Sequence, residues 1–196
     1  MSTPSTPTQR LAAALERYEA DDNLGVLMDD VRSIAKAVAP EELVVAAEPF
    51  RDRPEIVIPV YEHVVAVRPA DARALVALAN AYWITGRGPD VVGELAERAK
   101  RADPDNRGAW HLWALAEGNV RARVGRWTQV AERFPTDQLA RAALADNAAG
   151  LAGAEHDPLA LDVAVRTYEG LLAEAQTPTQ RRALEQTLET LKGWKL

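Results

Sequence analysis

Residues 74–86, ALVALANAYWITG, contain no charged side chain, although 27% of the whole chain is charged. Large apolar residues recur there three and four positions apart, at Leu75, Leu78 and Tyr82, which predicts an α-helix. A helix on an ordinary protein surface carries charged residues along its outer face. We therefore expect this helix either to be covered on most sides or to present an uncharged surface to a partner.

The rest of the chain follows a similar pattern. Prolines, glycines and Asp or Asn residues divide it into about ten segments, most of them 10 to 18 residues long. Alternation of β-branched and polar residues is nearly absent, and the short connections favour antiparallel neighbours. We expect a disordered tail over residues 1–7, then helical hairpins and a final amphipathic helix. The predicted hairpins span residues 8–38, 40–69, 71–104, 106–135 and 137–177, and the last helix spans 178–194.

One predicted hairpin carries prolines inside its helical segments. Pro49 and Pro59 both lie within residues 40–69. Proline removes a hydrogen bond donor from a helix and clashes with the preceding turn. We therefore expect this hairpin either to be kinked or to begin its second helix nearer Pro59, and the sequence leaves both alternatives open.

The segments are related to one another. Three predicted turns read RPAD at 68–71, DPDN at 103–106 and FPTD at 134–137, with prolines 35 and then 31 residues apart. The predicted first helices share a small residue at a matching position. These alanines, 32, 35 and 31 residues apart, are Ala47, Ala79, Ala114 and Ala145. Small residues let two helices approach closely, so the period indicates an array of stacked hairpins.

This pattern resembles the tetratricopeptide repeat (TPR), a helix–turn–helix unit of 34 residues. The match covers about residues 8–178 and is best over 72–106, with alanine in place of the signature glycine. The matching residues are Leu75, Leu78, Ala79, Tyr82, Gly86, Ala96, Ala99 and Pro104. The resemblance implies an all-α fold, a right-handed α-α superhelix (solenoid) of about four to five antiparallel hairpins. It also implies a C-terminal capping helix and a single repeat domain over residues 8–196.

In TPR arrays the first helix of each hairpin lines a concave groove. The resemblance implies that the groove residues here are Val76, Asn80, Trp83, His111, Leu115, Glu48 and Asp146. An apolar anchor of a partner peptide would enter beside Trp83, and Asn80 would pair with its backbone. The two carboxylates favour a ligand with basic flanks. The alternative for Trp83 is a core position, covered by the terminal helix or tail of the chain itself.

The composition narrows the classes of function. A formal net charge of −6 and a pI near 5.2 argue against nucleic-acid binding, which depends on neutralised phosphates. The best local basic patch, Arg121, Arg123 and Arg126, is interpreted as a solvated helix face. The absence of cysteine suits a reducing compartment, and we find neither a secretory signal nor an apolar segment of membrane-spanning length. We expect a cytoplasmic protein.

Groups for catalysis or metal binding are sparse. None of the serines stands in a nucleophile motif, and His63, His111 and His156 form no pair at the spacing of metal ligands. Gly86 and Gly88 follow a predicted helix and therefore indicate a turn rather than a phosphate-binding loop. We predict no catalytic residues, no cofactor and no metal ligands.

The clustered tryptophans Trp110, Trp113 and Trp127 are interpreted as core residues, with an aromatic cage or a base-stacking platform as the alternative.

Three functions are therefore weighed. The leading hypothesis is a non-enzymatic interaction module or scaffold that binds a protein or peptide segment in the concave groove. The second is a structural or assembly subunit that docks through its convex face or its ends into a larger complex or a homodimer. The third is an all-α enzyme with its site in the concave cavity. Fold resemblance alone does not decide among them.

Overall fold

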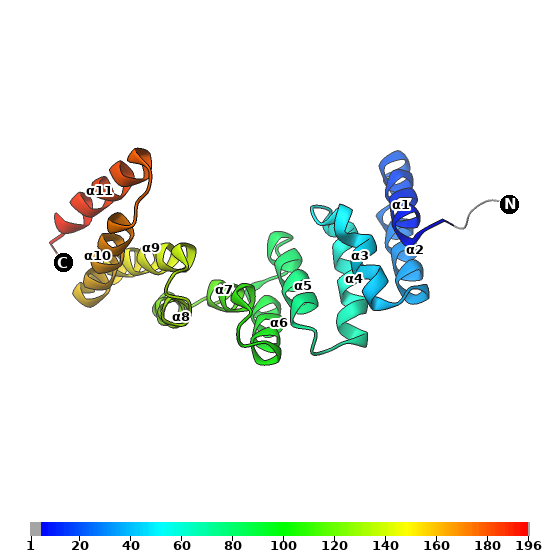
Figure 1. Cartoon of the computed structure of the whole chain (residues 1–196), viewed down its shortest axis with the longest axis horizontal. Helices are drawn as coiled ribbons and strands as arrows, with labels where there is room; N and C mark the ends of the chain where they lie inside the picture. The colour runs from blue at the N-terminus through cyan, green and yellow to red at the C-terminus, as the bar shows by residue number, and fades with distance from the viewer. Residues whose placement is uncertain (1–4, 196) are drawn as a thin grey trace. The chain divides into compact units, whose positions relative to one another are not determined.

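The structure is a computed structural model that describes residues 5–195, and within that range helices are the only regular elements (Figure 1). They are α1 (Pro7–Asp21), α2 (Leu24–Ala37), α3 (Pro40–Ala47), the 3₁₀ helix η1 (Glu48–Phe50), α4 (Pro54–Val67), α5 (Ala72–Ile84), α6 (Pro89–Ala102), α7 (Arg107–Leu115), α8 (Val120–Arg133), α9 (Gln138–Glu155), α10 (Pro158–Ala173) and α11 (Pro178–Lys192). The pairs from α1/α2 to α9/α10 match the five predicted hairpins, except that α1 begins at Pro7, one residue earlier than predicted, and α11 falls within the predicted last helix. The predicted all-α fold is confirmed.

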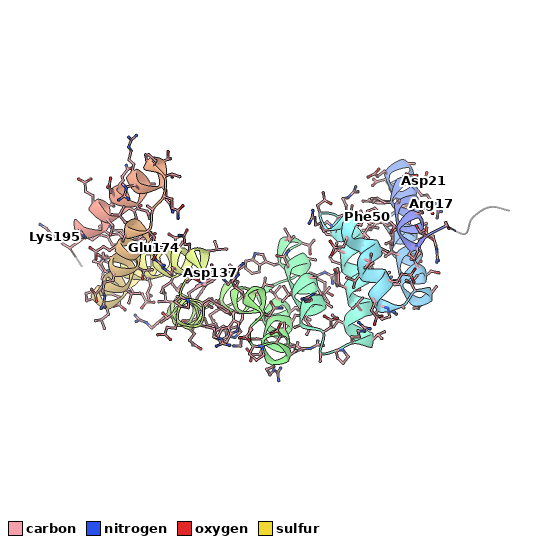
Figure 2. All side chains as sticks on the ribbon, in the orientation of Figure 1. Arg17, Asp21, Phe50, Asp137, Glu174 and Lys195 are labelled. Carbon is pink, nitrogen blue, oxygen red and sulfur yellow. The ribbon has the colours of Figure 1, made fainter. Side chains whose placement is uncertain are left out.

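Proline and short polar residues begin the helices. Proline suits the first helical turn, where its missing N–H has no partner in any case. It stands there in α1, α3, α4, α6, α10 and α11. Short polar side chains accept an N–H group of the first turn at Thr6, Asn23, Asp71, Asn119, Asp137, Asp157 and Thr177. One of these capping residues, Asp137, is labelled in Figure 2.

The end of the predicted tail takes part in the first of these caps. The Thr6 hydroxyl accepts the N–H of Gln9, and the Gln9 side chain accepts the N–H of Thr6, which together form a capping box. Pro7 is the first residue of α1. Residues 1–4 of the predicted tail lie outside the described residues.

Pro49 and Pro59 are accommodated in different ways. α3 ends at Ala47, and Pro49 lies in η1, the turn that follows; Phe50, labelled in Figure 2, closes that turn as a buried residue. α4 begins at Pro54, earlier than Pro59, and continues through it. Pro59 is fully buried, so packing around α4 offsets the hydrogen bond that the proline removes.

The described chain divides into two compact units, and the division falls within α7, after Leu112. In the first unit α1 packs on α2 and α3, α2 packs on α4, and α4 packs on α3 and α5, which pairs with α6. The large side chains with almost no exposure in this unit are Leu11, Leu27, Val31, Leu43, Ile56, Val60, Val64, Leu75 and Val92. The single domain predicted for residues 8–196 stays a prediction, and each unit is described by itself.

The second unit contains α8 to α11. Its core joins α9, α10 and α11 through Ala145, Ala148, Ala164, Tyr168, Leu171, Leu188 and Leu191. In α11 the leucines at helical spacing face this core, while Arg181, Arg182, Glu185 and Glu189 are exposed. This amphipathic pattern is the one predicted for a capping helix.

The shared alanines of the repeat pattern are all buried, since Ala47 is 2% exposed and Ala79, Ala114 and Ala145 are 0% exposed. Two of the three tryptophans predicted as core residues depart from the prediction. Trp127 is buried, but Trp110 and Trp113 are only half-buried.

Each of these two rings also meets a cation. Lys100 Nζ lies 4.5 Å from the Trp110 ring centre, and the Arg126 guanidinium lies 4.7 Å from that of Trp113.

Candidate functional site

The first unit contains a hollow between η1, α4 and α5, which we call the α3–α5 hollow. Its volume is about 170 Å³. It is lined by Ala47, Glu48, Arg51, Asp52, Pro54, Val57, Tyr61, Ala77, Asn80, Ala81 and Ile84. Ala47 lies at the end of α3, residues of α4 form one wall, and four residues of α5 form the opposite wall.

The spacing of residues along α5 explains why the hollow exists. Ala77, Ala81 and Ile84 lie three and four positions apart and therefore share one face of the helix, with Asn80 beside them. Two of these are alanines, whose short side chains leave space that Val57 and Tyr61 of α4 do not fill. Ile84 is 67% exposed at the end of this face. The walls are thus mainly apolar, although the hollow opens to solvent.

Polar groups stand around these walls. Glu48, Arg51 and Asp52 come from η1 and the turn after it, and all three are exposed. Burial raises the pKa of the Tyr61 hydroxyl, and the nearby carboxylates of Glu48 and Asp71 raise it further. Tyr61 is therefore held as the neutral phenol, which can both donate and accept a hydrogen bond.

Two of the predicted groove residues, Glu48 and Asn80, meet in the α3–α5 hollow. Val76 lies on the other side of Asn80, toward α7, since a Cβ atom placed on Gly108 would lie 3.2 Å from Val76 Cγ1. Trp83 shares that side of α5, is 40% exposed and does not line the hollow.

The remaining predicted groove residues are distributed over both units. His111 is half-buried in the part of α7 that belongs to the first unit. Leu115 and Asp146 belong to the second unit, where Asp146 accepts a hydrogen bond from the Tyr168 hydroxyl. That these residues share one groove with Asn80 stays a prediction.

Sequence reasoning missed most of the hollow. Tyr61, Ala77, Ala81 and Ile84 were not predicted, because the TPR resemblance marks groove residues on first helices along one stripe only. Ala77 and Ala81 carried a usable signal, since they are small residues one turn apart on a helix without charge. Tyr61 carried none, because its place in the hollow depends on how α4 packs against α5.

Comparison with known proteins rests on structure alone. No family model matches the sequence, and no curated protein matches it either. Among solved structures, the crystal structure of MamA protein aligns over 88% of this chain and 98% of its own, with a TM-score of 0.60 and 14% identity. TTC0263, a thermophilic TPR protein in Thermus thermophilus, aligns over 95% of this chain and 99% of its own, with a TM-score of 0.56 and 16% identity. The chain has a TPR-like fold.

A second hollow in the TPR-like first unit lies between α4, α5 and α6, on the side of the second helices. Its volume is about 480 Å³, and its walls include Val65, Leu78, Tyr82, Val91 and Leu95. Carboxylates stand beside it at Glu62 and Glu94, and the Tyr82 hydroxyl donates a hydrogen bond of 2.7 Å to Glu62. This hollow is larger but more open than the α3–α5 hollow.

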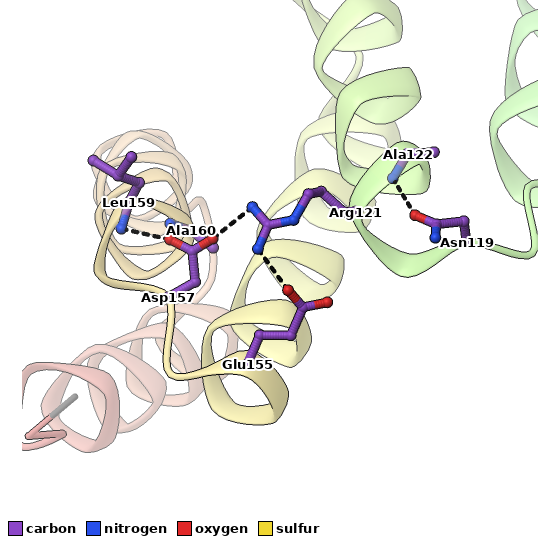
Figure 3. A network of polar contacts seen from close by, with 7 residues as sticks. All are labelled: Asn119, Arg121, Ala122, Glu155, Asp157, Leu159 and Ala160. Atoms are coloured by element: carbon purple, nitrogen blue, oxygen red, sulfur yellow. Dashed lines mark hydrogen bonds and ion pairs between the residues drawn. The ribbon is translucent and has the colours of Figure 1, made fainter.

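The three arginines of the predicted basic patch on α8 make hydrogen bonds and ion pairs within the second unit. Arg121 binds Asp157 at 2.7 Å and Glu155 at 2.5 Å (Figure 3). Arg123 donates to the Asn147 side chain at 2.8 Å, and Arg126 pairs with Glu117 at 2.7 Å. The three arginines therefore join α8 to its neighbours rather than standing as isolated positive charges.

Within residues 5–195 the structure places no group of three His, Asp or Glu side chains that could hold a metal ion. In the same range no helix is both long and apolar enough to cross a membrane. Gly86 and Gly88 have φ values of 72° and 93°, which glycine adopts readily, and they form the turn before α6.

Proposed function

We propose that this chain is a protein-interaction module that binds an extended segment of a partner protein across α5, with one large apolar side chain in the α3–α5 hollow. The observation that carries the proposal is the hollow itself, an open space of about 170 Å³ with mainly apolar walls. An apolar cavity of about 150 Å³ holds a benzene ring, so this hollow has the size for one aromatic or branched aliphatic side chain.

The residues around the hollow favour a peptide over a small molecule. Asn80 has both a donor and an acceptor, which suits a peptide unit of an extended chain. Ile84 and Trp83 leave apolar surface exposed on the same end of α5, where a bound segment would bury it. We propose that the segment passes Asn80, with its anchor on the α3 side and Trp83 on the α7 side.

The experiment that tests this function is a selection of displayed random peptides on the full chain. The affinities of the enriched peptides are then measured for three proteins, the wild type and two variants. Ala77→Leu places a larger side chain in the α3–α5 hollow, whereas Ala37→Leu makes the same change at an exposed position of α2. We expect Ala77→Leu to weaken binding by at least about tenfold and Ala37→Leu to leave it unchanged, with similar melting temperatures for both.

Equal binding to all three proteins would place the site elsewhere, and a selection without enriched peptides would contradict the proposed function. Trp83→Ala combined with Asn80→Ala tests the proposed path along α5. We expect the double variant to abolish capture of the selected peptides while its helical spectrum stays unchanged.

The hollow between α4, α5 and α6 favours the alternative, a structural or assembly subunit that docks through its second helices. Val91 is 44% exposed beside it. If this side is the interface, Val91→Arg will dissociate an assembly purified from the native organism and Ala77→Leu will not. The lack of catalytic activity, the lack of nucleic-acid binding, a cytoplasmic location and the oligomeric state stay predictions.

A further inference from the structure

The carboxylates at the α3–α5 hollow differ from most others nearby in having no partner. Glu48 and Asp52 make no side-chain hydrogen bond or ion pair with another described residue. In the same unit Glu41 pairs with Arg68, Glu55 pairs with Arg53, and Glu62 accepts from Tyr82. The two free carboxylates are therefore available to a group from outside the chain.

Positive charge at the hollow is weaker than negative charge. Arg51 is the one cationic residue among the described residues that line it, against Glu48 and Asp52. A third carboxylate, that of Asp71, also lies near enough to act on the hollow, because Asp71 and Glu48 both raise the pKa of Tyr61. A bound anion would be repelled by these groups, whereas a bound cation would be attracted.

The geometry of an extended peptide links this charge to the apolar walls. Successive residues of an extended chain advance by about 3.3 Å and point to opposite sides. When an apolar anchor enters the hollow, the side chains two positions away point to the same side and lie over its rim. Long lysine and arginine side chains can reach Glu48 and Asp52 from these positions.

We propose that the partner segment is basic, with a large apolar anchor and with lysine or arginine two positions to either side of it. This inference rests on the proposed function, because it names the chemistry of the segment that the α3–α5 hollow accepts. Binding is then driven by burial of the anchor, and the flanking charges provide selectivity that depends on ionic strength.

The test compares two fluorescein-labelled nonapeptides with the same central phenylalanine, GGKSFSKGG and GGESFSEGG. We expect the lysine peptide to bind the full chain at least about tenfold more tightly at low salt, and this preference to shrink in about 0.5 M salt. Glu48→Gln combined with Asp52→Asn should remove the preference, and Arg51→Gln should increase it. None of these side chains is buried, so all the variants should fold.

A preference for the glutamate peptide, no binding of either peptide, or a lysine preference that survives the double substitution would each overturn the inference. The failure of the proposed function has a different signature. If the inference alone is wrong, the selected library peptides still lose affinity for Ala77→Leu but carry no excess of lysine or arginine two positions from their anchor. If the proposed function is wrong, the selection yields no enriched peptides, or Ala77→Leu has no effect on those that are enriched.

Discussion

Two tyrosines donate their hydroxyl hydrogens to carboxylates on the preceding helix. Tyr82 on α5 donates to Glu62 on α4, and Tyr168 on α10 donates to Asp146 on α9. Burial, followed by the hydrogen bond to Glu62, raises the pKa of Tyr82 to about 12. Burial and the contact with Asp146 also raise the pKa of Tyr168.

A raised pKa in the folded state makes stability depend on pH. Folding favours the protonated phenol of Tyr82. Its contribution to the free energy of unfolding is fully present below the ordinary tyrosine pKa, near 10, and is lost as the pH rises toward about 12. We expect the free energy of unfolding to fall between these pH values in urea titrations. Tyr82→Phe should make the fall less steep, and an unchanged slope would show that the Tyr82 hydroxyl does not cause it.

Asp157 combines a helix cap with an ion pair. It accepts the N–H groups of Leu159 and Ala160 and also binds Arg121. The N–H of Ala160, then the Arg121 guanidinium, hold the pKa of Asp157 below its ordinary value. Asp157→Asn keeps an acceptor for the cap and loses the ion pair, whereas Asp157→Ala loses both. We expect thermal melting to rank wild type, Asp157→Asn and Asp157→Ala in order of falling stability, and an alanine variant as stable as the asparagine variant would show that the cap contributes nothing.

Close packing between elements depends on small residues at fixed places. Ala79 and Ala114 have no exposed surface, and overpacking such a site typically costs about 1–3 kcal/mol. We expect Ala79→Leu and Ala114→Leu each to lower the free energy of unfolding in urea by about that amount. The exposed Ala37→Leu is the control. Two neutral variants would mean that the repeat pattern has been placed wrongly along the chain.

Gly153 in α9 provides the contact surface for Trp194, which follows the last helix. A Cβ atom at Gly153 would lie 3.3 Å from the Trp194 ring. Gly153→Leu should therefore displace the ring and increase quenching of Trp194 fluorescence by iodide, measured as the difference from Trp194→Phe. Gly150→Leu is a matched control on the same helix, because its added Cβ meets no atom within 4 Å. If the two leucine variants quench alike, the contact does not hold Trp194.

The elements were largely predictable from the sequence, and the candidate site was not. Proline at the first turn and polar caps are local signals, so the hairpins could be placed without a structure. Pro59 is a misleading signal for the start of α4. The helix continues through this proline because α4 is buried, and burial is a tertiary effect that the local sequence does not show. The hollow likewise depends on how α4 packs beside α5, and the contact between Lys100 and the Trp110 ring depends on how α6 packs beside α7.

At the scale of the whole molecule, we expect a wholly helical protein without a bound metal. A far-ultraviolet spectrum should show helix and no strand component. Chelators should change neither the melting temperature nor peptide binding, because the described residues offer no ligand set. A shift of several degrees on metal removal would contradict this expectation.

The most direct test of the central claim is nuclear magnetic resonance mapping of a selected peptide on the full isotope-labelled chain. The claim is that the α3–α5 hollow takes an apolar side chain of a partner segment. We expect the largest shift changes at Tyr61, Ala77, Asn80, Ala81 and Ile84, and weak changes around Val91 and Leu95. Changes concentrated at the second hollow or in the second unit, with the residues of the α3–α5 hollow unaffected, would contradict the claim.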